Sequence, residues 1–134
     1  MIVVVGDLPV MSCKLIKRVG ESAFSETNLE ITASDLAAWL ADSSKPQPLL
    51  LDVREDWEVQ LASIAGSLHM PMNLIPLRMG ELPDDRTIVT VCHHGVRSYQ
   101  VGLYLANAGF EQVLSLRGGV EAWASDIDPA MAHY

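Results

Sequence analysis

The stretch that decides the fold is TIVTVCHHGVRS, residues 87–98. Its first five residues, Thr87–Val91, are apolar or β-branched and predict a buried strand. Gly95 permits a positive φ, so we expect the segment after the strand to curl into a tight loop. A helix should follow, because apolar residues recur at helical spacing. These are Val101, Tyr104, Leu105 and Ala108.

Further strands are predicted on both sides of this stretch. Leu49–Val53 is apolar apart from Asp52 and does not alternate, which suits a strand buried on both faces. Val113–Leu116 follows the helix, whose end is marked by Gly109, and strand–helix–strand of this length indicates a right-handed parallel crossover. Upstream, Leu29–Ile31 is a short strand candidate, and Thr32 is expected to cap a helix. We therefore expect an α/β fold with helices covering a mostly parallel sheet.

Length and composition fit one globular domain. The chain has 134 residues, 49% of them hydrophobic, enough to bury a core without a disulfide or structural metal. A net charge of −8 argues against a nucleic-acid partner, and no apolar run approaches the ~20 residues of a membrane-spanning helix. The start of the chain lacks the features of a secretory signal. The chain holds only Cys13 and Cys92, which excludes a disulfide framework and favours the cytoplasm.

The pattern divides the chain in two. Residues 1–28 lack a clear periodicity, and we expect an N-terminal extension that is partly disordered. Organised structure is expected over residues 29–134. Cys13 lies in the extension and is interpreted as incidental, with a resolving thiol as the alternative.

Basic residues follow the three longer predicted strands. In parallel sheets ligands bind at the carboxyl ends of strands, so a cationic crevice there would attract a small anion. These basic residues are Arg54, Arg97 and Arg117, which follow the predicted strands 49–53, 87–91 and 113–116. The alternative is that such arginines pair with local carboxylates, which we favour for Arg54. Its neighbours in sequence include Glu55, Asp56 and Glu58.

Cys92 is the residue best suited to chemistry. A loop that curls at Gly95 points backbone N–H groups inward, and the next helix adds the positive end of its dipole. With the charge of Arg97, this field stabilises a thiolate, which is the reactive form of cysteine. Cysteine is also common as a small, buried apolar residue. That alternative does not explain why Gly95 and Arg97 follow Cys92 in this loop.

The sequence here resembles the rhodanese family of sulfurtransferases, in its single-domain members, from about Ile31 to Tyr134. The family's loop of Cys, two variable residues, Gly, one residue, Arg and then Ser or Thr is met by Cys92, Gly95, Arg97 and Ser98. Further matches are Asp52-Val53-Arg54, Gly109-Phe110, Gly118-Gly119, Ala122-Trp123 and Asp128-Pro129. One departure is Ser63, where the family usually has histidine. The resemblance implies a rhodanese-like domain over residues 29–134, with a central five-stranded, mostly parallel sheet and helices on both faces.

The resemblance also implies an activity. Cys92 would accept a sulfane sulfur from a small anionic donor such as thiosulfate, and cyanide, a thiol or a sulfur-accepting protein would remove it from the persulfide. The active-site loop would comprise His93, His94, Gly95, Val96, Arg97 and Ser98 together with Cys92. Arg97 is expected to shape the loop and hold the donor, with a structural role through backbone carbonyls as the alternative. Arg54 and Arg117 are candidate contributors to the crevice.

His93 and His94 occupy variable positions and are expected to modulate the site by adding positive charge as the pH falls. We expect no cofactor and no metal, because adjacent histidines beside a cysteine do not easily converge on one ion.

Two other functions compete. Phosphatases and arsenate reductases of related fold are less favoured: the phosphatases carry five residues between Cys and Arg, whereas four separate Cys92 from Arg97 here. The shorter loop makes a smaller cradle, which suits a sulfur atom better than a phosphoryl group. A persulfide carrier without turnover, or a protein-interaction module, is the other alternative. The intact cysteine argues against a purely binding module.

Overall fold

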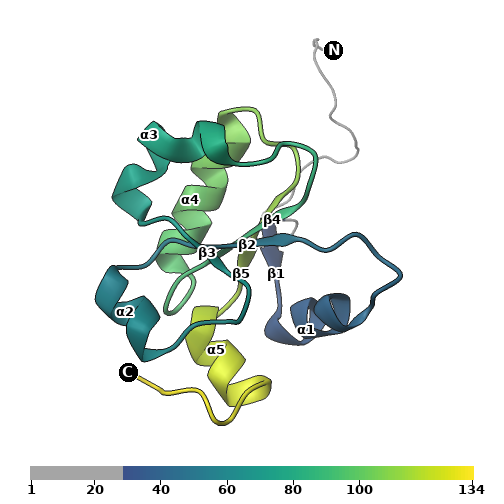
Figure 1. Ribbon diagram of the computed structural model, residues 1–134, viewed down its shortest axis with the longest axis vertical. Coiled ribbons are helices and arrows are strands. Elements are labelled where there is room, and N and C mark those ends of the chain that lie inside the picture. The colour runs from purple at the N-terminus through teal and green to yellow at the C-terminus, as the bar shows by residue number, and fades with distance from the viewer. Residues whose placement is uncertain (1–28) are drawn as a thin grey trace.

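A computed structural model describes residues 29–134 (Figure 1). The predicted extension, 1–28, and Cys13 lie outside the described residues. The strands are β1 Glu30–Ile31, β2 Leu49–Asp52, β3 Leu68–His69, β4 Ile88–Val91 and β5 Val113–Leu116. The α-helices are α1 Ala33–Ala41, α2 Asp56–Leu61, α3 Ile75–Arg78, α4 Val96–Asn107 and α5 Gly119–Asp126. Two 3₁₀ turns, η2 Met72–Leu74 and η3 Met79–Glu81, flank α3.

The five strands form one sheet in the order β1-β5-β4-β2-β3. Every pairing among the described strands is parallel. This confirms the α/β fold with a five-stranded parallel sheet. The strand β4 lies between β2 and β5, so a residue just after β4 is flanked by the carboxyl ends of both neighbours.

Helices cover both faces of the sheet, as Figure 1 shows. On one face, the core under α1 and α5 includes Leu50, Val89 and Val91. On the other, the core under α3 and α4 includes Leu51 and Ile88. Successive residues of one strand therefore point into two different cores. The apolar run of β2 lacks alternation because both of its faces are buried.

Local signals place the helix ends near the predicted positions. The Oγ1 atom of Thr32 accepts a hydrogen bond from the backbone N–H of Asp35 at 3.1 Å, which caps α1 as expected. The helix α4 begins at Val96, directly after Gly95 with its φ of 104°. Gly109 follows its end with a φ of 108°. Between residues 29 and 134, none of the helices is both long and apolar enough to cross a membrane.

Candidate functional site

Cys92 lies directly after β4 and is 1% exposed. Its Sγ accepts hydrogen bonds from the backbone N–H of Gly95 at 3.0 Å and of Ser98 at 3.3 Å. The thiol lies 3.4 Å from the Oγ of Ser98, to which it donates. N–H groups that converge on a sulfur favour negative charge there. The structure thus brings together three residues that the sequence singled out.

The start of α4 is anchored to the sheet below it. Ser98 is buried, and its Oγ lies 2.7 Å from the Oγ of Ser115 in β5. Its carbonyl accepts a hydrogen bond from the Oγ1 of Thr90 in β4 at 2.8 Å. These contacts fix the N–H of Ser98 in the position from which it donates to the Cys92 sulfur.

The start of α5 holds the loop from the other side. The N–H of Val120 donates to the carbonyl of Cys92 at 2.8 Å, and that of Glu121 donates to the carbonyl of His93 at 3.1 Å. Gly119 has a φ of 60°, and a Cβ atom there would overlap both carbonyl groups. Glycine is therefore required for the helix to approach this closely. The sequence comparison noted the glycine pair without assigning it this role.

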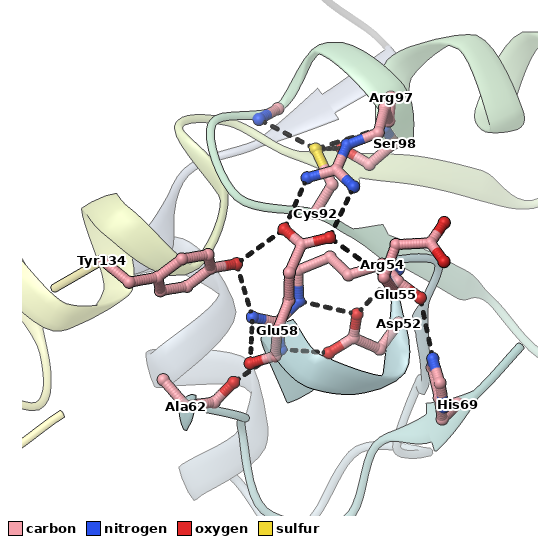
Figure 2. A network of polar contacts seen from close by, with 11 residues as sticks. Asp52, Arg54, Glu55, Glu58, Ala62, His69, Cys92, Arg97, Ser98 and Tyr134 are labelled. Carbon is pink, nitrogen blue, oxygen red and sulfur yellow. Dashed lines mark hydrogen bonds and ion pairs between the residues drawn. The ribbon is translucent and has the colours of Figure 1, made fainter. Parts of the chain in front are cut away.

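Arg97 forms a two-pronged ion pair with Glu58 of α2. Its Nη1 and Nη2 each lie 2.8 Å from one oxygen of that carboxylate (Figure 2). We expected Arg97 to bind loop carbonyls or a donor, and named Glu58 only as a neighbour of Arg54. Glu58 is 3% exposed, and the guanidinium of Arg97 compensates its buried negative charge.

This pair perturbs both groups. The guanidinium of Arg97 is the main cause that lowers the pKa of Glu58 from 4.5 to about 2, with the N–H of Glu55 and the hydroxyl of Tyr134 adding to it. Hydrogen bonding to Glu58 likewise raises the pKa of Arg97. Both groups therefore stay charged through the range in which the protein would work.

Arg54 is 0% exposed and pairs with Asp52, through Nε at 2.8 Å and Nη2 at 2.6 Å. The favoured alternative of a local ion pair is confirmed, but the partner expected from the sequence was wrong. The carboxylate of Glu58 is held by Arg97, and only its backbone carbonyl accepts from Arg54, at 3.3 Å. Arg117 pairs with Glu30 at 3.2 Å. The structure therefore brings neither Arg54 nor Arg117 to the loop as a free cation.

His93 and His94 stack on each other, with ring centroids 3.9 Å apart. Burial, followed by the charge of His94, lowers the pKa of His93, so this ring stays neutral to a lower pH than an exposed histidine would. Its Nε2 is buried without a hydrogen-bond partner among the described residues. His94 is exposed.

Glu121 lies beside this histidine pair, which the sequence did not indicate. His93, His94 and Glu121 each place one ligand atom within 4.8 Å of the others. The sequence argument against a metal considered only the two histidines and the cysteine, and did not include Glu121. The planes of the two histidine rings are 24° apart. Glu121 is also engaged by the Nδ1 of His133 at 2.9 Å.

We expect Glu58→Gln to remove an acid-dependent part of the stability. A carboxylate whose pKa is lower in the folded chain stabilises the fold above its unfolded pKa of 4.5, and that stability is lost as the pH falls toward about 2. From the size of the shift, the parent should lose roughly 3 kcal/mol more than Glu58→Gln over this window. Urea unfolding at a series of pH values measures the difference.

The matched control is Glu81→Gln, because Glu81 also pairs with an arginine, Arg78, but at the surface. Exposed pairs contribute little, so this variant should keep the acid dependence of the parent. If the free energy of unfolding fell equally with pH in the parent and in Glu58→Gln, the pair of Glu58 and Arg97 would not be a source of stability.

Comparison with known proteins agrees with this geometry. The model of the rhodanese-like domain family matches residues 32–126. A sulfurtransferase of Allochromatium vinosum is 44% identical over 103 residues, which are 77% of this chain and 94% of that protein. The thiosulfate sulfurtransferase GlpE of Vibrio cholerae is 34% identical over 89 residues, or 66% of this chain and 84% of that protein. A solved rhodanese-related protein from Thermoplasma volcanium has a TM-score of 0.66 at 28% identity, covering 73% of this chain and 92% of that chain.

Proposed function

The chain belongs to the rhodanese-like domain family, and from that premise we propose that it is a sulfurtransferase in which Cys92 carries the sulfur. The observation that supports this most is the convergence of two backbone N–H groups on the Cys92 sulfur. The donor is a small anion such as thiosulfate. The acceptor is a thiol, cyanide or a sulfur-accepting protein. We place the protein in the cytoplasm, where thiols stay reduced.

Sulfur transfer proceeds in two displacements. The thiolate of Cys92 attacks the sulfane sulfur of thiosulfate, the sulfur–sulfur bond breaks, and sulfite leaves with its electron pair. The acceptor then attacks the outer sulfur of the persulfide, and the Cys92 thiolate leaves. The N–H groups of Gly95 and Ser98 are already in place for the anionic sulfur, so no reorganisation is needed during the reaction.

Arg97 has two roles in this scheme. Its pairing with Glu58 fixes the first turn of α4, which also carries the N–H of Ser98. Its side chain remains about one-third exposed (35%), and its charge acts on Cys92. We assign to this exposed part the attraction of the anionic donor toward the sulfur.

Arg97→Ala is expected to lower the rate of persulfide loading more than Arg97→Lys does, and both variants should be slower than the parent. A guanidinium binds both oxygens of Glu58 at once, which an ammonium cannot do. For Arg97→Ala, the loss of charged hydrogen bonds corresponds to about a 10- to 100-fold lower rate. The rate is measured with limiting thiosulfate, at a temperature where all variants are folded.

Arg78→Ala is the control, because Arg78 pairs with Glu81 on the surface of α3 and η3. It should load at the parental rate. Full activity of Arg97→Lys would show that Arg97 acts as a charge alone.

Mass spectrometry after thiosulfate treatment tests the proposed function. The parent should gain one sulfur atom on the peptide that contains Cys92, and Cys92→Ala should gain none. Treatment of the loaded parent with cyanide, and separately with thiols, then distinguishes an enzyme from a carrier. Repeated turnover supports the enzyme, loading without turnover identifies a carrier, and absence of loading contradicts both.

A further inference from the structure

Tyr134 joins the loop, α2 and the buried arginine, although it lies far from all of them in sequence. Figure 2 shows its hydroxyl between Glu58 and Arg54. It donates to the Oε1 of Glu58 at 3.0 Å and accepts from the Nη1 of Arg54 at 2.8 Å. A single hydroxyl thus links both ion pairs of the site.

The hydroxyl restricts the carboxylate that holds Arg97. The Oε1 of Glu58 has two donors, Arg97 and Tyr134, whereas its Oε2 has Arg97 and the N–H of Glu55. Without the hydroxyl, one side of this carboxylate depends on Arg97 alone. The Nη1 of the fully buried Arg54 would keep only its longer contact, at 3.3 Å, with the carbonyl of Glu58.

The ring of Tyr134 contacts the loop itself. It stacks on the ring of His93, with centroids 3.8 Å apart and planes 12° from parallel. Trp57 of α2 also packs edge-on against Tyr134, with ring centroids 5.9 Å apart. His93 follows Cys92 directly, and its carbonyl is held by the N–H of Glu121. The residue after the sulfur carrier is therefore fixed at its backbone by α5 and at its side chain by Tyr134.

We infer that Tyr134 is a positioning residue of the site: its hydroxyl fixes Arg97 through Glu58, and its ring fixes the loop through His93. It acts through these residues and makes no contact with Cys92 in the described structure. Its role in sulfur transfer rests on the proposed function, but its effect on the surroundings of Cys92 does not.

The test compares how fast Cys92 reacts with iodoacetate, an anion, and with neutral iodoacetamide. A well-placed Arg97 favours the anion, so the ratio of the two rates reports its position. We expect Tyr134→Phe, which keeps the ring, to lower this ratio about three- to tenfold, as the net contribution of one typical hydrogen bond implies. Peptide mass spectrometry separates alkylation at Cys92 from that at Cys13.

A double variant shows whether Tyr134 acts through Glu58. Residues that act through one another are not additive, so Tyr134→Phe should have no further effect on the ratio in a Glu58→Gln background. Tyr104→Phe is the matched control, since Tyr104 lies on α4 and is 43% exposed. It should leave the ratio unchanged. Thermal unfolding of each preparation sets a temperature at which every variant is folded.

The outcomes separate this inference from the proposed function. An unchanged or raised ratio in Tyr134→Phe overturns the positioning role, even when the parent loads sulfur normally. The positioning role is also overturned if the effects of Tyr134→Phe and Glu58→Gln on the ratio simply add in the double variant. That result would show that Tyr134 does not act through Glu58. If the ratio falls as expected but the parent gains no sulfur from thiosulfate, Tyr134 positions Arg97 and the proposed sulfur transfer is wrong.

Discussion

Cys92→Ser is expected to abolish sulfur transfer from thiosulfate to cyanide while the protein stays folded. A serine hydroxyl fits the same space and accepts the same N–H groups, but it does not ionise at this site and forms no persulfide. Loss of a nucleophile in other enzymes suggests a decrease on the order of a thousandfold or more. Thiocyanate formation and the thermal midpoint are measured on the same preparation.

Cys13→Ser is the control for this experiment. Cys13 is the other cysteine of the chain, and we expect its replacement to leave both thiocyanate formation and the thermal midpoint unchanged. Transfer at the parental rate in Cys92→Ser would remove Cys92 from the mechanism. A large loss in Cys13→Ser would show that sulfur transfer needs both thiols.

Gly119→Ala is expected to damage both stability and sulfur transfer. Its φ of 60° disfavours any residue with a Cβ atom by about 1–2 kcal/mol. The added Cβ would also overlap the carbonyl groups of Cys92 and His93, so the loop or α5 must move. A displacement of about 1 Å near reacting atoms can cost on the order of 100-fold in rate. The measurements are urea unfolding and the rate of persulfide loading.

Gly80→Ala is the matched control, because a Cβ atom at Gly80 meets no atom within 4 Å in the described structure. It should unfold and load sulfur as the parent does. Parental loading by Gly119→Ala would show that the close approach of α5 does not determine the geometry at the sulfur.

Elements with a local signal were predicted well. Val113–Leu116 matches β5 residue for residue, and the helix after Gly95 matches α4. Both depend on the pattern of neighbouring residues. The two-residue strand β3 and the helix α5 were not identified from periodicity. The strand β3 is defined only by its pairing with β2. The helix α5 begins with glycine, which lets it approach the loop closely.

The sequence by itself determined the local geometry of the loop around Cys92. Cys92, Gly95 and Ser98 lie within seven consecutive residues. The turn that brings the N–H groups of Gly95 and Ser98 to the Cys92 sulfur therefore depends on local backbone geometry. For this reason Cys92 could be predicted from the sequence alone as the candidate sulfur carrier, and neighbouring residue patterns likewise predicted the fold class.

Only the tertiary structure decided which charges meet. Glu58 is 39 residues from Arg97, and Tyr134 is 80 residues from Arg54. Arginine and tyrosine side chains are long. Four carboxylates lie within four residues of Arg54, whereas none lies within ten residues of Arg97. Which one becomes the partner depends on how α2 packs against the loop and where the chain returns after α5. Such packing brings distant residues together in space, and spacing along the chain does not encode it.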